Sequence, residues 1–172
     1  GTADYKMSYM PQISSAKKQL TVGGAAGVNE GTIEKVSATL NFKNFNTYQY
    51  LGGIAGQNGA QTKAASLAKI TGCAYSGEIT EKGGAAGNCY GGITGINYAT
   101  LENCKVPQIT MTVQGVYTAT STSTAEQKEQ LASHAGGIAG KNETNGVING
   151  CLLTDTDKST LSAAYGMLGG VT

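Results

Sequence analysis

The sequence has no tryptophan, only two prolines and a single histidine among its 172 residues. Charged residues are also scarce, at 13% of the chain, which is about half the usual share. Twelve basic and eleven acidic side chains give a net charge of +1, so no broad field exists to attract phosphates or anionic lipids. We therefore expect neither nucleic acid nor a membrane surface as a partner. The 26 glycines, with so little proline, exclude collagen and disordered Pro/Gly tracts and indicate recurring tight corners.

Long apolar runs are missing as well. No window of about 18 apolar residues occurs, so direct membrane insertion is not expected, and the N-terminus lacks the layout of a signal peptide. Gly1 resembles a cloning remnant, and the last residues, 168–172, break off inside a motif that is complete earlier in the chain. We expect one domain, residues 1–172, excised from a longer chain.

That motif is an internal repeat with the pattern Gly-Gly-x-x-Gly-x-Asn. It occurs at 23–29, 52–58, 91–97 and 136–142, with a partial copy at 169–172. The first glycines are 29, 39, 45 and 33 residues apart. The surplus length falls in polar stretches such as 60–69 and 115–133, so the repeat is one structural unit plus loops of variable length.

A second shared element follows each motif, at Ile33–Val36, Ile70–Cys73, Leu101–Cys104 and Ile148–Cys151. Between these elements lie short runs with strand propensity, namely Val36–Phe42, Tyr48–Leu51, Tyr75–Thr80 and Gln108–Val113. Short strands with one apolar stripe bury it by stacking on identical units. The repeats therefore predict an all-β parallel β-helix, or β-solenoid, right-handed and of about four to five coils. One helix, at Ala125–Ala132, is expected in the longest loop.

Stacking aligns equivalent residues in columns about 4.8 Å apart. We expect three inward apolar columns, formed by Ile54, Ile93 and Ile138, by Ile33, Ile70, Leu101 and Ile148, and by Val36, Cys73, Cys104 and Cys151. Asn29, Asn58, Asn97 and Asn142 are expected to form a ladder in which each side-chain amide donates to the next. Glycine pairs fit the corners of the coil, where alanine should be costly: Gly52, Gly53, Gly91, Gly92, Gly136 and Gly137.

The motif at 136–142, followed by Gly146-Val-Ile-Asn-Gly-Cys151, resembles the GLUG repeat of bacterial surface proteins. The resemblance covers most of the chain in four copies. It departs from the pattern at Ala25 and Ala26, in the irregular spacing and in the long loop after Gly115. It implies a secreted or wall-attached bacterial protein, such as an adhesin-like protein or an immunoglobulin-A peptidase, in which these repeats are accessory.

Residues for chemistry are few. The only histidine, His134, is followed by Ala-Gly-Gly, so no His-Glu-x-x-His helix exists, and we expect a surface or loop residue, no metal, no cofactor and no enzyme activity. Asp155 and Asp157 fail the calcium-loop pattern, because Thr160 stands where glycine is needed and Gly166 where glutamate is needed.

Four cysteines are present, and three share one repeat position, which favours free, buried thiols. A Cys73–Cys104 disulfide between adjacent coils is the alternative. Cys89 stands outside that position; if it is exposed, we expect it to be the reactive thiol.

Function follows from this shape as a non-catalytic, extracellular or cell-surface stalk or adhesin module. A ligand-binding site is expected in the loop 115–133, at Tyr117, Thr118, Thr120, Glu126 and Lys128. The partners expected are a host glycan, an extracellular-matrix protein or neighbouring domains of the same chain. The alternative is a glycan-binding or polysaccharide-processing β-helix, with Tyr48, Tyr50, Tyr75, Tyr90 and Tyr117 as sugar-stacking platforms. The competing interpretation of these tyrosines is that they pack on the flank of the solenoid.

Overall fold

The structure is a computed structural model and describes residues 20–45, 49–61, 67–81, 87–114, 124–125, 132–163 and 166–169. These residues form short β-strands, joined by tight corners, and one 3-10 helix at Thr156–Lys158. The strands make four sheets, and every pairing among the described strands is parallel. The chain is therefore all-β with parallel sheets, as the repeats predict.

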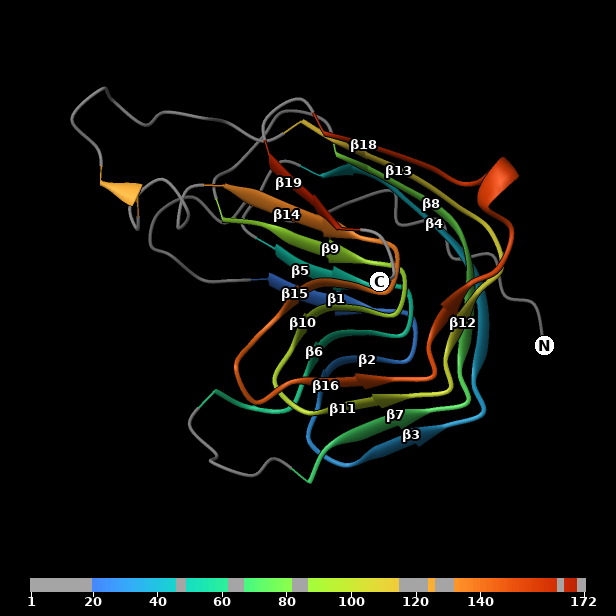
Figure 1. The fold of residues 1–172 in the computed structure, drawn as a ribbon, viewed down its shortest axis with the longest axis vertical. Coiled ribbons are helices and arrows are strands. Elements are labelled where there is room, and N and C mark those ends of the chain that lie inside the picture. The colour runs from blue at the N-terminus through green and yellow to red at the C-terminus, as the bar shows by residue number, and fades with distance from the viewer. Residues whose placement is uncertain are drawn as a thin grey trace.

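Each repeat contributes one layer, which passes through sheets A, B, C and D in that order (Figure 1). Sheet A contains β1 (Leu20–Gly23), β5 (Gln49–Gly52), β9 (Cys89–Gly91), β14 (Ser133–Gly136) and β19 (Gly166–Gly169). Sheet B contains β2 (Ala26–Asn29), β6 (Ala55–Asn58), β10 (Thr94–Asn97) and β15 (Ala139–Asn142). Sheet C contains β3 (Thr32–Glu34), β7 (Lys69–Thr71), β11 (Thr100–Glu102) and β16 (Val147–Asn149). Sheet D contains β4 (Ser37–Phe45), β8 (Ala74–Glu81), β12 (Lys105–Val106), β13 (Ile109–Val113), β17 (Leu152–Leu153) and β18 (Thr160–Ala163).

The register is the one that the repeat alignment predicts. Asn97 pairs with Asn58 on one side and with Asn142 on the other, and Gly52 pairs with Gly23 and Gly91. The unequal spacing of the motifs therefore does not disturb the stack. The extra residues lie between strands, mostly where the chain passes from sheet D to sheet A of the next layer.

The four predicted strands are present with shifted ends. Val36–Phe42 corresponds to β4, Tyr48–Leu51 to β5, Tyr75–Thr80 to β8 and Gln108–Val113 to β13. Strand β4 extends to Phe45 because it pairs with β8 along almost its whole length. Most of the predicted helix Ala125–Ala132 lies outside the described residues.

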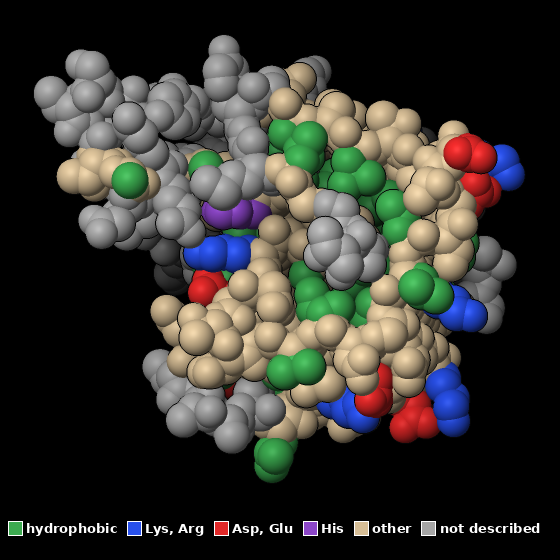
Figure 2. All heavy atoms as spheres, viewed as in Figure 1, with side chains coloured by type: hydrophobic (Ala, Val, Ile, Leu, Met, Phe, Trp, Pro, Cys, Tyr) green, Lys and Arg blue, Asp and Glu red, His purple; other side chains and the backbone are tan. Residues whose placement is uncertain are grey.

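One apolar core runs through the stack, enclosed by the inward faces of the four sheets. The column Ile54, Ile93 and Ile138 is buried, as are Ile70 and Leu101 in the neighbouring column. Ile148, predicted inward, is 39% exposed because its layer is the last in sheet C, and Val147 and Leu152 of that layer are also exposed. Figure 2 shows apolar side chains reaching the surface in the middle of the face that it presents.

Sheets A and B meet at the glycine pair and then run back alongside each other (Figure 1). The third glycine of the motif makes this close approach possible. A Cβ at Gly95 would collide with the backbone of Leu51 and Cys89, and one at Gly140 would collide with the backbone of Tyr90. Sheet B therefore covers the outer face of sheet A, and some side chains that point away from the main core are still buried.

Candidate functional sites in the repeat columns and at the strand ends

An asparagine ladder runs along the corner between sheets B and C. The side-chain amide of Asn29 donates to Asn58 at 2.8 Å, that of Asn58 donates to Asn97 at 2.8 Å, and that of Asn97 donates to Asn142 at 2.7 Å. Each amide also donates to a backbone carbonyl, such as that of Thr100 for Asn58, at 3.1 Å. The predicted ladder is therefore present, and its direction is the same at every step. Asn142, in the last layer, is exposed.

A column of left-handed residues marks the corner between sheets C and D. Lys35, Gly72, Asn103 and Gly150 have φ values of 55°, 60°, 54° and 61°. Each immediately precedes Val36 or one of the three aligned cysteines. Glycine and asparagine tolerate this conformation best, which explains why they recur there, whereas Lys35 adopts it at a steric cost.

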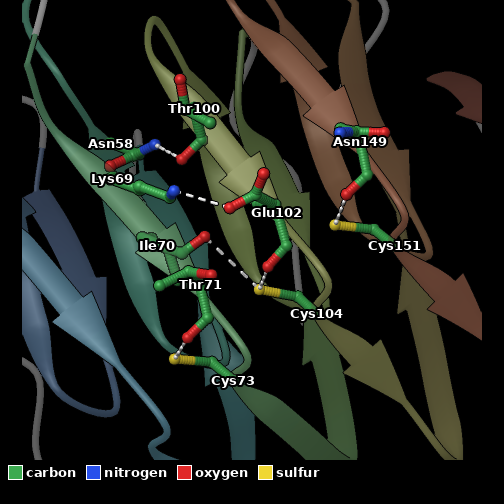
Figure 3. A network of polar contacts seen from close by, with 10 residues as sticks. All are labelled: Asn58, Lys69, Ile70, Thr71, Cys73, Thr100, Glu102, Cys104, Asn149 and Cys151. Carbon is green, nitrogen blue, oxygen red and sulfur yellow. Dashed lines mark hydrogen bonds and ion pairs between the residues drawn. The ribbon is translucent and has the colours of Figure 1, made fainter.

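The cysteine column follows directly from that corner, and Figure 3 shows its three side chains on successive layers. Each thiol donates to the carbonyl two residues earlier: Cys73 to Thr71 at 3.4 Å, Cys104 to Glu102 at 3.5 Å and Cys151 to Asn149 at 3.6 Å. All three are free thiols and buried, as the shared repeat position predicts, and the alternative Cys73–Cys104 disulfide is not formed.

The three thiols of the column also interact with one another. Hydrogen bonding to Cys104 lowers the pKa of Cys73 and of Cys151, while the same two contacts raise the pKa of the Cys104 thiol. Because its pKa is raised, the Cys104 thiol keeps its proton. Since each thiol has a hydrogen-bond partner in an apolar column, the arrangement fits core packing better than nucleophilic chemistry.

The outer face of sheet C carries an ion pair beside this column (Figure 3). The ammonium group of Lys69 lies 2.6 Å from the carboxylate of Glu102 on the next layer, and this partner lowers the pKa of Glu102. A second ion pair of this face, Glu34 with Lys35, spans 3.0 Å. Exposed pairs of this kind contribute little to stability. Because each carboxylate is engaged by an ammonium group, this face does not present a free acid–base pair.

Cys89 does not meet the condition under which it was expected to be reactive, because it is not exposed. Cys89 lies in β9 and is 3% exposed, because it faces sheet B, where it packs with Ile96, Tyr98 and Tyr50 in a second apolar cluster. Burial raises the pKa of the Cys89 thiol to about 12. A thiol with so high a pKa is almost entirely protonated at neutral pH, so Cys89 is a poor nucleophile.

The predicted position of His134 is wrong, because this residue is also buried. It was expected on the surface or in a loop, but it lies in β14, is 9% exposed, and pairs in register with Cys89. The cause is again the return of sheet B alongside sheet A, which the sequence pattern did not indicate. Lys141 and Glu143 form an ion pair of 3.1 Å at the edge of this region.

Sequence analysis missed a buried polar cluster at the ends of the sheet D strands. Glu81 is 1% exposed, and one of its carboxylate oxygens accepts from the side-chain amide of Asn88 at 2.7 Å and from the hydroxyl of Tyr90 at 2.9 Å. The other oxygen accepts from the backbone N–H of Gln114 at 2.9 Å. None of these residues belongs to a repeated column of like side chains, so the repeats gave no signal. The period-two pattern of Ile79 and Glu81, both inward, is the only hint in the sequence.

The predicted ligand-binding residues lie outside the described residues. This applies to Tyr117, Thr118, Thr120, Glu126 and Lys128, so their role stays a prediction. Two of the candidate sugar-stacking tyrosines, Tyr75 and Tyr90, are fully buried and therefore cannot contact a sugar. They are core residues, neither stacking platforms nor flank residues. Tyr75 donates its hydroxyl hydrogen to the carbonyl of Leu40 at 2.9 Å.

Asp155 is the N-cap of the 3-10 helix and Asp157 lies within it, and the carboxylate of Asp155 pairs with the ammonium group of Lys158 at 3.1 Å. Within the described part of the chain, no group of three or more His, Cys, Asp or Glu residues is arranged to hold a metal ion. The same residues include no helix of the length and apolarity needed to cross a membrane.

Comparison of the chain with protein-family models, with curated proteins and with solved structures found no match.

Proposed function

We propose that this chain is a non-catalytic β-solenoid module of an extracellular bacterial surface protein, of the GLUG-repeat type, which acts as a stiff stalk or adhesin segment. The observation that carries the proposal is the unbroken asparagine ladder, which keeps four layers in one register although the motifs are 29, 39 and 45 residues apart. A right-handed coil is part of the proposal, because parallel crossover connections strongly favour that hand.

A repeated structure of this kind suits a spacer. Each layer contacts mainly its neighbours, so stiffness and length come from the number of layers rather than from any single site. The asparagine side chains at the corner between sheets B and C are hydrogen-bonded within the stack. Glu102 and Glu78 are engaged in ion pairs, and Cys104 interacts with the other thiols of its column. This distribution favours a structural role over catalysis.

Display of a binding surface is the second part of the proposal. The chain passes from sheet D to sheet A between β4 and β5, between β8 and β9, between β13 and β14 and between β18 and β19, so all these connections leave the stack along one rim. The longest of them separates Val113 from Ser133. Variable connections on a regular scaffold are where binding residues concentrate. A host glycan or an extracellular-matrix protein is the proposed partner class.

The test is binding of the purified chain to a panel of host glycans and matrix proteins. The matched variant replaces residues 116–131 by a short Gly/Ser linker and leaves Gln114 and Ser133 in place. Saturable binding by the parent chain that is lost in the variant supports an adhesin module. Equal binding by both chains excludes that connection as the binding site, and no binding by the parent chain across the panel leaves the stalk role.

Hydrolysis or elimination of a polysaccharide substrate by the purified chain would overturn the non-catalytic proposal. The assay therefore includes product analysis on the glycans of the panel. The linker variant serves as a folded control, provided that its circular dichroism matches that of the parent chain.

A further inference from the structure

Glu81 carries a carboxylate at a buried, inward-facing position of β8, where the other buried side chains of the strand are apolar. It is the last residue of β8, and it follows the inward alternation of Tyr75 and Ile79, both fully buried. A buried carboxylate persists only where hydrogen bonds replace its hydration. Within the described part of the chain, Asn88, Tyr90 and Gln114 each donate such a bond to Glu81.

The acceptor and its donors come from three strand ends. Glu81, the acceptor, ends β8; among the donors, Asn88 directly precedes β9, Tyr90 lies within β9, and Gln114 directly follows β13. One carboxylate therefore joins the end of a sheet D strand, the start of the next sheet A strand, and the end of the sheet D strand one layer further on. The backbone N–H of His134, in β14, donates to the carbonyl of Asn88 at 2.7 Å and links a fourth strand to the same cluster.

We propose that Glu81 is a positioning residue, a clamp that holds the ends of β8, β9 and β13 together at the rim from which the sheet D to sheet A connections leave. The inference goes beyond the proposed stalk or adhesin role and does not depend on any partner. Loss of the clamp opens the strand ends at this rim and leaves sheets B and C closed.

The clamp can be tested by exchanging the carboxylate of Glu81 and the amide of Asn88, because these two groups are hydrogen-bonded to each other. Glu81→Gln replaces one acceptor by an NH₂ group, which faces either the amide of Asn88 or the N–H of Gln114. While the Asn88 side chain keeps its present orientation, two donors oppose each other whichever way the glutamine is placed. Asn88→Asp places a second buried carboxylate against Glu81.

The double variant removes both conflicts. The amide of the new glutamine donates to the new carboxylate at position 88 and to the Tyr90 hydroxyl. That hydroxyl lies 2.7 Å from the Asn88 amide nitrogen and can donate to a carboxylate oxygen at the same place. The remaining glutamine oxygen still accepts from Gln114. Both single variants are therefore expected to be worse than the double variant, which an additive structural effect does not produce.

Amide hydrogen exchange on the full chain, followed by mass spectrometry, is the readout. In Glu81→Gln we expect exchange in the peptides that cover 87–91 and 109–114 to accelerate about ten- to a hundredfold, the range for losing hydrogen bonds to a buried charge. Peptides from sheets B and C, such as 26–34 and 94–102, are expected to keep the parent rates. The double variant should recover most of the protection at the rim.

Glu78→Gln is the matched control, because it makes the same change on the same strand at a partly exposed ion pair with Lys43, 2.7 Å long. It is expected to leave rim exchange unchanged. Should Glu81→Gln fail to fold, Tyr90→Phe removes one of the three donors and is expected to give a smaller, still local, acceleration of about three- to tenfold. The clamp is refuted by uniform acceleration in all four sheets, by a double variant no better than the singles, or by equal effects of Glu81→Gln and Glu78→Gln.

Discussion

The side-chain amide of Asn58 donates to the side-chain oxygen of Asn97 at 2.8 Å, across 39 residues of sequence. Both residues are fully buried, so neither amide can turn to water if its partner is lost. Their hydrogen bond is one rung of a ladder that sets the register between layers. Alanine substitutions along the ladder should therefore show that the burial of an asparagine, and not the size of its side chain, decides how much stability is lost.

Asn97→Ala is expected to lower the free energy of unfolding by about 3–5 kcal/mol, because it leaves the donor of Asn58 without its acceptor and removes two donated bonds. Asn142→Ala, at the exposed end of the ladder, is expected to cost about 1 kcal/mol. Urea-unfolding midpoints of the two variants provide the measurement. Equal losses at the two positions would contradict a ladder in which burial decides the cost.

Two substitutions at the left-handed corner are expected to change the stability of the fold in opposite directions. A Cβ at Gly72 has no neighbour closer than 3.7 Å, so Gly72→Ala tests backbone conformation alone and is expected to destabilise by about 1–2 kcal/mol. Lys35→Gly relieves the same strain and is expected to stabilise the fold by up to about 1 kcal/mol. The gain is limited because glycine loses more conformational entropy on folding than lysine does. Thermal midpoints of both variants decide the matter, and destabilisation by Lys35→Gly would show that φ is not the controlling quantity.

The glycine pair offers a comparison based on space. A Cβ at Gly52 would overlap the carbonyl oxygen of Ala55 and approach Thr94 of the next layer, whereas one at Gly31 has nothing within 4 Å. Gly52→Ala is therefore expected to prevent formation of the native stack, and Gly31→Ala to change stability by less than about 1 kcal/mol in either direction. Soluble yield and the circular dichroism of each variant provide the test. A folded Gly52→Ala chain would mean that the corner can relax.

Stability at high pH should reflect Cys89. Because burial raises its pKa to about 12 in the folded state, the folded chain holds the thiol proton more tightly than the unfolded chain, whose thiol has a pKa of 9.0. The resulting stability is complete below pH 9.0 and falls by about 1.4 kcal/mol per pH unit as the pH rises towards 12. Buried Tyr75 and Tyr90, whose pKa values are also raised, contribute with the same sign at higher pH.

Urea midpoints measured from about pH 7 to about pH 11 check this expectation. Cys89→Ala is the comparison, because it removes the titrating thiol and should flatten the first part of the decline. Parallel curves for the two chains would show that Cys89 does not titrate in this window.

The repeated part of the fold was predictable from the sequence because stacking copies one local environment from layer to layer. Asn58 and Asn97, or Cys73 and Cys104, occupy equivalent places and therefore carry equivalent side chains. The strands were predictable for the same reason, to within a few residues at their ends. Ile148 is exposed because it lies in the last layer of sheet C. The alignment of repeats shows that Ile148 is equivalent to Leu101, but not that no further strand covers it.

What escaped prediction depends on residues that occur once. The burial of Cys89 and His134 follows from the return of sheet B alongside sheet A, and only the third glycine of the motif, such as Gly95, indicates that two backbones approach there. The Glu81 cluster combines side chains from two layers that have no counterparts elsewhere in the repeat. Pairing of unique residues across a long sequence separation leaves no periodic signal.

The tolerance of the stack for unequal spacing has a genetic consequence. Because one repeat forms one layer, and Asn97 meets Asn58 and Asn142 through the same contacts, an in-frame duplication of a whole repeat adds a layer whose hydrogen-bonding partners already exist on both sides. Insertions in the connections between sheets D and A leave those contacts unchanged. Recombination between the copies of such a gene is therefore expected to change the number of layers without breaking the asparagine ladder.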